Sequence, residues 1–565
     1  MPFLVAEEQE AAKRVHTHLL IDDPMSAISE AEYYLKTYPD SKALRLAHIK
    51  ALCQAGNEIA ALEEWNTLSI KHEDLMQDRS ALEMLAWGVL NKGEASSQLA
   101  IKVNSLIGAS MTRDAKAIPL ILEGLRGTNS MIRALSVGLA AAYGDLPLQE
   151  ELARLLKEET VWSVRLELIK SVGQLRMKET KQRLIEIISH PRTLAEEKVA
   201  AIISIVNMYD SIDDKELATL IRSDRAGIRE LASQIISHLN LYDKVSLLLP
   251  LLADAHPGVR LSALNTLALL RVKEIENKNI MQIEQVTRLM RDHIPEVAIT
   301  ASWLALIHGD KRGEKNLKRW IQRGEENFAR LAAGALSVSG KKGVPLAKVL
   351  LKKNKSPYIQ VTLALGLIGQ REAVELACKT IDTHLSITEK WMWDTSLNPL
   401  FRSLAPSKVS HVSQIPNYPS VVNQMTRIEL LQVLCIMGYK GAEQAVKGFL
   451  QADTWGPVGA AAATLLQEGD EQALDIIRAL LKDPEEKIRI QAALILALLG
   501  GDKQAVSVLK EAYPNASREV KLHILEAIAK TKDEEAISFL LDRLNEPFQV
   551  LRVVAATAII QCLYH

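Results

Sequence analysis

The stretch 254-DAHPGVRLSALNTLALL-270 sets the pattern for most of this chain. It begins with Asp, passes through a short turn, and continues with a β-branched residue, Arg260 and an apolar segment of helical period. The stretches 224-DRAGIRELASQIISHL-239 and 483-DPEEKIRIQAALILALLG-500 show the same features in the same order. We therefore expect a repeated unit made of a first helix, a turn, and a second helix that opens near the Arg.

The residue that aligns with Arg260 in each unit is called the ladder residue here. Successive ladder residues are about 31 residues apart, except for one interval of 38 and one of 67. The thirteen ladder residues are Arg133, Arg165, Lys198, Arg229, Arg260, Ala298, Arg330, Gln360, Arg427, Gly459, Arg489, Lys521 and Arg552. Helix pairs this short cannot bury their own apolar faces, but a stack of them buries a continuous core. The pattern predicts an all-α fold, an α-solenoid superhelix of stacked helix pairs.

The composition agrees with stacked helices and excludes several classes of protein. Only 4% of the 565 residues are aromatic, and the formal net charge of −1 gives no global field that would attract nucleic acid or an anionic membrane. The four cysteines are far apart and lack metal-type spacing, so we expect reduced thiols. The N-terminus turns acidic after five residues, and no apolar run reaches the length of a spanning helix. We expect a cytoplasmic protein.

The Asp, the turn and the β-branched residue followed by Arg resemble the short HEAT repeats that are also found in phycobilisome-lyase-type proteins. The resemblance covers residues 111–565 and is specific for architecture. It implies little about activity, because this fold is used by scaffolds, lyases, hydroxylases and DNA-repair enzymes.

Residues 1–110 follow a different spacing. The segment 43-ALRLAHIKALCQAGNEIAALEEWNTL-68 resembles a tetratricopeptide repeat, with Gly56, Ala61 and Trp65 at its small and aromatic positions. It departs from that pattern at Ile49, which occupies the position of the first glycine. We expect about two such units, which form a TPR-like helical cap.

The recurring Arg has two interpretations. It could form a basic row along a groove, or it could pair with turn aspartates inside the solenoid. We favour the structural interpretation, with pairing within or between repeats. The pairs considered are Asp224 with Arg229, Asp254 with Arg260 and Asp483 with Arg489.

The interval of 67 residues contains an insertion between the two helices of one repeat, at residues 386–420. It holds Trp391, Trp393, Phe401 and Tyr418 among four prolines. We expect a short helix up to about residue 404, followed by extended chain. Two interpretations remain open: the aromatic side chains cover apolar surface on adjacent repeats, or they bind a partner.

A basic segment precedes this insertion. Residues 311–355 contain thirteen Lys or Arg against three Glu. This segment is either a solvated rim or a surface for nucleic-acid phosphates, an acidic protein or anionic lipid. The residues singled out as candidates for partner binding are Lys315, Lys318, Arg319, Arg323, Lys352 and Lys353.

Motifs for catalysis, phosphate binding or metal binding were sought and not found. His16 and His18 diverge by about 200° on a helix, which disfavours a shared metal. We expect no cofactor, no metal and no enzymatic activity. The predicted function is a protein-binding scaffold that uses its concave second-helix surface, in four parts: 1–110, 111–385, 386–420 and 421–565. The alternatives are a nucleic-acid-binding, DNA-repair-like protein and, with less support, a bilin-lyase-like enzyme.

Overall fold

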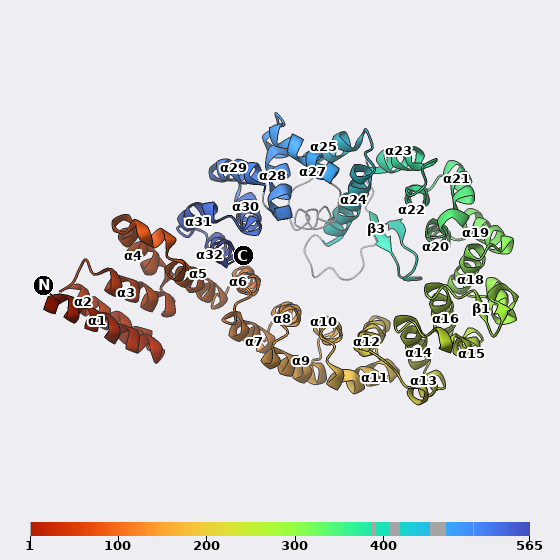
Figure 1. The fold of residues 1–565 in the computed structure, drawn as a ribbon, viewed down its shortest axis with the longest axis horizontal. Coiled ribbons are helices and arrows are strands. Elements are labelled where there is room, and N and C mark those ends of the chain that lie inside the picture. The colour runs from red at the N-terminus through yellow and green to blue at the C-terminus, as the bar shows by residue number, and fades with distance from the viewer. Residues whose placement is uncertain (1, 386–390, 407–417, 453–470, 501, 565) are drawn as a thin grey trace. The chain divides into compact units, whose positions relative to one another are not determined.

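The computed structural model describes residues 2–385, 391–406, 418–452, 471–500 and 502–564 (Figure 1). The described chain is almost entirely helical, with two short β-hairpins. It divides into two compact units. Unit 1 contains the described residues of Met1–Leu152 and Ile477–His565, and unit 2 those of Ala153–Ala452 together with 471–476. The two units are defined by spatial contacts between segments. The boundary expected near residue 110 instead separates TPR-like from HEAT-like repeats, so it does not coincide with a boundary between the units.

The N-terminal part of unit 1 consists of antiparallel helix pairs. Polar side chains start several of these helices: Ser41, Asn57 and Asp78 each accept a hydrogen bond from a backbone N–H in the first turn that follows. Three pairs precede residue 112, where the spacing indicated about two. They are α1 (Pro2–Leu20) with α2 (Pro24–Leu35), α3 (Lys42–Gln54) with α4 (Glu58–Lys71), and α5 (Arg79–Glu94) with α6 (Leu99–Met111).

The second helices of the HEAT-like repeats begin where the sequence indicated. In all the described second helices except α20 and α24, the ladder residue is the fourth residue of the helix, so the turn and the helix start recur together. The second helix expected at Gly459 lies outside the described residues. The second helices are α8 (Ser130–Tyr143), α10 (Trp162–Gln174), α12 (Ala195–Met208), α14 (Ala226–His238), α16 (Pro257–Leu269), α18 (Pro295–Ile307), α20 (Glu326–Ser337), α22 (Pro357–Leu367), α24 (Tyr418–Ile436), α28 (Glu486–Gly500), α30 (Arg518–Thr531) and α32 (Gln549–Tyr564).

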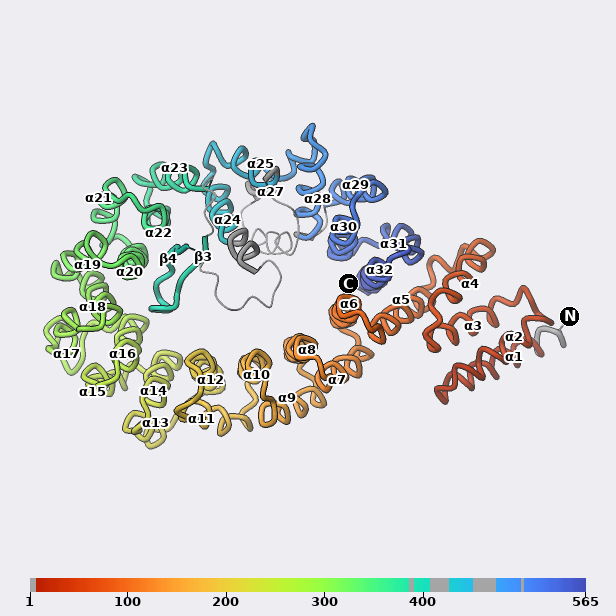
Figure 2. The backbone as a smooth tube through the Cα atoms, turned by 180° about the vertical axis from the view of Figure 1, so that it is seen from behind, coloured from red at the N-terminus to blue at the C-terminus, as the bar shows by residue number. Residues whose placement is uncertain are grey.

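The first helices of the repeats are shorter and more variable. They are α7 (Ala117–Arg126), α9 (Leu146–Glu158), α11 (Lys181–Ser189), α13 (Asp214–Ile221), α15 (Leu248–Leu252), α17 (Glu284–Arg288), α19 (Lys311–Arg323), α21 (Val344–Lys353), α23 (Val374–Leu385), α25 (Ala442–Ala452), α27 (Glu471–Ala479), α29 (Lys503–Ala512) and α31 (Ile537–Arg543). Within unit 2, the second helices form one row and the first helices form the other (Figures 1 and 2). Among the described residues, no helix is both long and apolar enough to cross a membrane.

Small residues let consecutive second helices approach each other closely. The Ala or Ser three positions after the ladder residue is at most 1% exposed at every such position that the structure describes. These residues are Ser136, Ala201, Ala232, Ala263, Ala301, Ala333, Ala492 and Ala555. Ala462, the ninth, lies outside the described residues. At Gly173 of α10, an added Cβ would overlap Ser204 of α12, so this close approach requires glycine.

The interval of 38 residues has a local cause. A hairpin of β1 (Glu274–Ile275) and β2 (Lys278–Asn279) is inserted between α16 and the first helix of the next repeat. Its two turn residues, Glu276 and Asn277, have φ values of 50° and 61°. A two-residue turn with both φ values positive matches the twist of a hairpin.

The ladder residues Arg229 and Arg260 pair with an acid of the following repeat and not with the aspartate of their own turn. Arg229 donates to both carboxylate oxygens of Asp254, at 2.6 and 2.9 Å, and Arg260 does the same to Asp292, at 2.9 Å for both bonds. The expected pairs Asp224 with Arg229 and Asp254 with Arg260 are therefore wrong. The physical reason is that the turn offers its own arginine backbone carbonyls instead: Arg260 also donates to the carbonyl oxygen of Asp254, at 2.9 Å.

The third expected pair differs in the same way. Arg489 donates to the carbonyl oxygens of Asp483 and Pro484, at 2.9 and 3.0 Å, while the Asp483 carboxylate accepts from the backbone N–H of Glu485. Asp224 is exposed. Arg229, Arg260 and Arg489 thus fix their own turns through carbonyl groups, and for Arg229 and Arg260 an acid from the next repeat fixes the stacking. Arg330 differs, because it pairs with Glu326 of its own helix.

The C-terminal repeat packs against the N-terminal helices within unit 1. Helix α32 contacts both α5 and α6 (Figure 1). Its ladder residue, Arg552, donates to Glu58 at the start of α4, at 2.7 Å, and both side chains are largely buried. Glu58 of the N-terminal segment therefore occupies the position that an acid of the next repeat occupies for Arg229 and Arg260.

Candidate functional site

The insertion forms a β-hairpin where its first half was expected to form a helix. β3 (Trp391–Asp394) pairs antiparallel with β4 (Ser403–Pro406), with Trp391 opposite Pro406. The hairpin packs on α20, α22 and α24. The expectation of a helix was wrong because the conformation of this segment depends on tertiary contacts, and because Trp and Phe fit a half-buried strand surface well. Residues 407–417, expected to be extended, lie outside the described residues.

Asn398, in the turn of the hairpin, is completely buried and bonds to the second helices of two repeats. Its amide donates to Asn265 Oδ1 at 3.0 Å and to Thr300 Oγ1 at 2.9 Å, and it accepts from Asn265 Nδ2 at 3.3 Å. The backbone N–H of Leu404 donates to Thr362 Oγ1 at 3.0 Å. Paired buried amides of this kind hold a segment in one position.

The candidate aromatic residues divide into buried and half-buried side chains. Trp391 and Phe401 are 1% and 0% exposed, and the Phe401 ring lies edge-on to Trp303, with centroids 4.9 Å apart. Trp393 is half-buried, with the Arg402 guanidinium 4.1 Å from its ring centroid. The side chain of Tyr418 lies outside the described residues. In this conformation, Trp391 and Phe401 contact the neighbouring repeats and do not present their rings to solvent.

The basic candidates lie on first helices, whereas the hairpin lies on second helices. Lys315, Lys318, Arg319 and Arg323 are exposed on α19, and Lys352 and Lys353 are exposed at the end of the adjacent α21. The structure therefore brings the basic residues together in one surface. It does not join them to the aromatic residues, which lie on the other row of helices in unit 2 (Figure 2).

A groove of about 700 Å³ lies in the N-terminal segment, on residues that the sequence analysis did not single out. Its floor is apolar and is formed by Leu46 and Cys53 of α3 with Met84 and Trp87 of α5. An added Cβ at Gly88 would overlap Cys53, so glycine is needed where α5 meets α3. Burial raises the pKa of the Cys53 thiol to about 12, so this cysteine is a neutral part of the floor.

Both acids that line the groove are bound internally. Asp78 accepts from the backbone N–H groups of Ser80 and Ala81 and so caps α5. Burial alone would raise the pKa of Glu83, but ion pairing with Lys116 and a hydrogen bond from the Tyr564 hydroxyl hold it below its usual range. The negative charges of the groove are therefore already compensated.

Of the two lysines that line the groove, Lys116 pairs with Glu83, whereas Lys50 is not compensated by any described acid. Lys50, half-buried on the groove wall, has no ion-pair partner among the residues that the structure describes. Its charge also acts on His16 across the groove: partial burial and the Lys50 ammonium group together lower the pKa of His16. Gln54 and Asn91 add amide groups to the rim. The groove therefore combines apolar side chains with an ammonium group and two amides. This combination could bind an extended peptide that carries a carboxylate and an apolar side chain.

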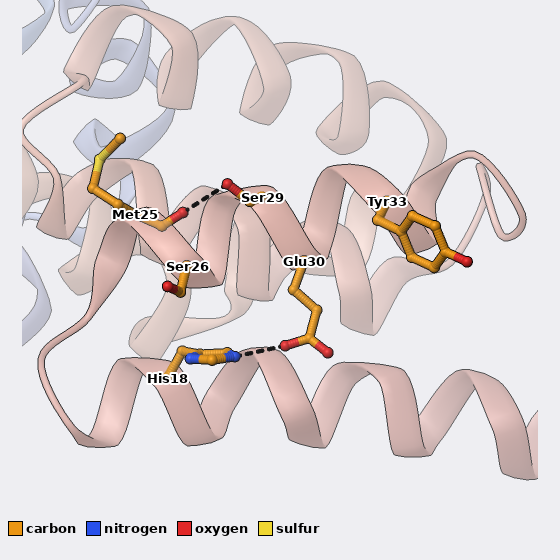
Figure 3. Close-up of a pocket in the computed structure, with 6 residues that line it drawn as sticks. All are labelled: His18, Met25, Ser26, Ser29, Glu30 and Tyr33. Carbon is orange, nitrogen blue, oxygen red and sulfur yellow. Dashed lines mark hydrogen bonds and ion pairs between the residues drawn. The ribbon is translucent and has the colours of Figure 1, made fainter.

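A second hollow, between α1 and α2, is shallower and its polar groups pair with one another. Figure 3 shows His18 directed at Glu30, with Nε2 2.7 Å from Oε2, and the Ser29 hydroxyl donating to the carbonyl of Met25 at 3.1 Å. Because the Glu30 carboxylate is already paired with His18, this hollow is a weaker candidate than the groove.

One signal in the sequence could have indicated the groove. Leu46, Lys50 and Gln54 are four residues apart, so they share one face of the helix expected over residues 43–54. A lysine between apolar positions on the face of a TPR-like first helix is unusual for a core. The remaining lining of the groove could not be found this way, because Trp87 and Lys116 are distant in sequence from this helix.

Comparison with known proteins identifies the repeats. The family model for HEAT repeats matches residues 476–560. No curated protein matches the chain. Among solved structures, the karyopherin Kap121p bound to the extreme C-terminus of the protein phosphatase Cdc14p is similar at 12% identity and a TM-score of 0.28, covering 97% of this chain and 83% of that one. The UNC-45 chaperone is similar at 12% identity and a TM-score of 0.34, covering 99% and 82%.

Structural similarity at these TM-scores does not indicate a shared function. The family match, the recurring turns and the stacked helix pairs agree with one another. Residues 476–560 match HEAT repeats, and the described chain has an α-solenoid fold of stacked helix pairs.

Proposed function

We propose that this chain is a non-catalytic protein-binding scaffold, and that the groove lined by α1, α3 and α5 takes an extended segment of a partner. The observation that carries the proposal is Lys50, a half-buried residue of the groove lining whose ammonium group has no acidic partner among the described residues. A carboxylate from a partner would form a charge-assisted hydrogen bond with this ammonium group. The four cysteines, all unpaired and buried, fit a reducing compartment, and we place the protein in the cytoplasm.

The apolar floor defines the rest of the ligand. Leu46, Met84 and Trp87 offer contact to an aliphatic or aromatic side chain, while Gln54 and Asn91 can bond to main-chain amides. The expected ligand is a protein segment with a carboxylate next to a large apolar residue.

A peptide-display library panned against the full chain tests this proposal. Enriched peptides should combine Asp, Glu or a terminal carboxylate with an apolar residue, and Lys50→Gln should weaken their binding by about tenfold or more, because hydrogen bonds to charged groups contribute about 1.5–3 kcal/mol each. Lys36→Gln is the matched control, since Lys36 is exposed at the end of α2 and does not line the groove.

Histidine NMR gives an independent measurement. A bound carboxylate beside Lys50 should raise the pKa of His16, which burial and the Lys50 charge now lower. Enriched peptides that bind Lys50→Gln as tightly as wild type, and leave the His16 titration unchanged, would show that the groove is not the binding site.

A further inference from the structure

Helix α19 carries a row of cations at helical spacing. Lys311, Lys315, Arg319 and Arg323 are each four residues apart, and all four are exposed. The opposite face of the helix buries Gly313, Leu317 and Ile321. The four cations therefore lie along one side of the helix, over a length of about 18 Å.

This row is unfavourable for the helix itself. Like charges four residues apart destabilise a helix by about 0.2–0.5 kcal/mol per pair, and cations in the N-terminal half oppose the helix dipole. Arg323 in the last turn has a structural reason to be basic, as Lys352 and Lys353 have in the last turn of α21. Lys311 and Lys315, near the start of α19, have none.

Internal acids do not neutralise the row. Glu314 is the one acidic residue of α19, and no ion pair joins it or these four cations to any other described residue. By contrast, neighbouring basic residues are compensated: Arg312 binds Asp310 at 2.6 Å, and Arg330 binds Glu326 at 2.9 Å. The exposed face of α19 and the adjoining end of α21 therefore present cations that no described acid pairs with, although neighbouring basic residues are paired.

We propose that the exposed basic face of α19, extended by Lys352 and Lys353 of α21, is a docking surface for an acidic, Glu- or Asp-rich segment of a protein. A helix with Glu at every fourth position places carboxylates about 6 Å apart, which matches the spacing of the cations. Charge complementarity of this kind speeds association and selects partners.

Nucleic acid fits this surface less well. Single-stranded nucleic acids are held by aromatic platforms in addition to charge. The aromatic side chain of α19, Trp320, is half-buried and lies edge-on to Phe328, with centroids 6.1 Å apart, so it is not a platform for a base. The row also spans one helix only, which limits the number of phosphates it can neutralise.

The test uses the full chain and a fluorescent helical peptide with Glu at every fourth position, at low ionic strength. The peptide should bind, and the variant Lys311→Gln/Lys315→Gln/Arg319→Gln/Arg323→Gln should bind about tenfold more weakly or worse. The matched control is Lys157→Gln/Arg192→Gln/Lys215→Gln/Arg222→Gln, which removes the same charge from exposed residues of unit 2 outside this face and should bind as wild type does.

Three results would overturn the proposal: equal loss of binding in both quadruple variants, equal binding of a peptide with Gln in place of Glu, or tighter binding of an oligonucleotide of matched charge that displaces the peptide. Because like-charge repulsion is relieved, the α19 variant should melt no lower than wild type. A lower melting temperature would assign the cations a structural role and would also overturn it.

The surface on α19 is independent of the proposed groove. Lys50→Gln should leave binding of the Glu peptide unchanged, and the α19 variant should leave binding of groove-selected peptides unchanged. Failure of one site is thus distinguishable from failure of the other.

Discussion

The guanidinium of Arg552, in the last helix, lies 2.7 Å from the carboxylate of Glu58, a residue 494 positions earlier in the chain. The same side chain donates to the carbonyl oxygen of Glu546 in its own turn, at 2.9 Å. This is the arrangement of Arg229 and Arg260, with an acid from the next repeat and a carbonyl from its own turn. The C-terminal repeat and the N-terminal segment are therefore joined as consecutive repeats are.

Arg552→Met should open this junction. Removing one partner of a buried ion pair leaves the other charge uncompensated, at a cost of about 3–5 kcal/mol. Because repeat proteins do not unfold as a single cooperative unit, hydrogen exchange is the appropriate measurement: amides of α32 and α5 should exchange faster, while those of unit 2 should not change. Lys530→Met, an exposed lysine of α30, should leave α32 protected.

Gly108→Ala should weaken the same junction through packing. A Cβ at Gly108 of α6 would overlap the Thr557 hydroxyl of α32. Gly448→Ala, in α25, is the matched control, because nothing lies within 4 Å of its added Cβ. Alanine is favoured over glycine in a helix interior by about 1 kcal/mol, so the control should be neutral or stabilising. Differential scanning calorimetry should show melting temperatures that move in opposite directions, and a stabilising Gly108→Ala would contradict the contact.

Asn398→Ala should release the hairpin from the second helices of unit 2. It removes the bonds to Asn265 and Thr300 and leaves their polar groups buried, which costs about 1–3 kcal/mol for each unsatisfied group. Peptides covering residues 391–406 should exchange backbone hydrogen faster. Ser396→Ala, which loses only the bond that the Ser396 hydroxyl donates to the nearby Asp394, should not have this effect. Unchanged exchange in Asn398→Ala would show that the amide network does not hold the hairpin.

Features that are specified by residues close together in the sequence could be predicted, whereas features that depend on contacts between distant residues could not. The turn before Arg260 and the start of α16 were predictable, because the Asp, Pro257 and the periodic apolar residues that specify them are within a few positions of one another. The hairpin was not, because Asn398 finds its partners 133 and 98 residues away, at Asn265 and Thr300. Local propensity indicated a helix broken near Pro399, but contacts with distant residues stabilise a hairpin instead.

The same distinction applies to the two candidate sites. The basic face was predictable as a charge excess, since its residues are close in sequence, and the helical spacing of Lys315, Arg319 and Arg323 follows directly from their numbers. The groove was not predictable, because its two walls come from helices that meet only through the stacking of α3 on α5. The acid partner of Arg229 was misassigned because the nearest aspartate in sequence, Asp224, is not the nearest in space.

The pairing of Arg260 with Asp292 makes the stability of unit 2 depend on pH. Both side chains are 7% exposed. Burial alone would raise the pKa of Asp292, but the hydrogen bonds from Arg260 and from the backbone N–H of Ile294 lower it below the usual value of about 3.9. A carboxyl whose pKa is lowered by folding contributes stability that is fully present above its unfolded pKa and is lost as the pH falls through the folded value.

Asp292→Asn should therefore be less stable than wild type at neutral pH, by about 3 kcal/mol, because the Arg260 charge is left uncompensated. The difference should shrink as the pH falls below about 4, since wild type then loses the same charge. Urea unfolding followed by circular dichroism at neutral and acidic pH measures both quantities. Asp224→Asn is the control: this exposed aspartate of the preceding turn makes no ion pair with Arg229, so its substitution should change stability little at either pH. A deficit in Asp292→Asn that stays constant down to pH values well below 4 would mean that the pair is not ionised in the folded protein.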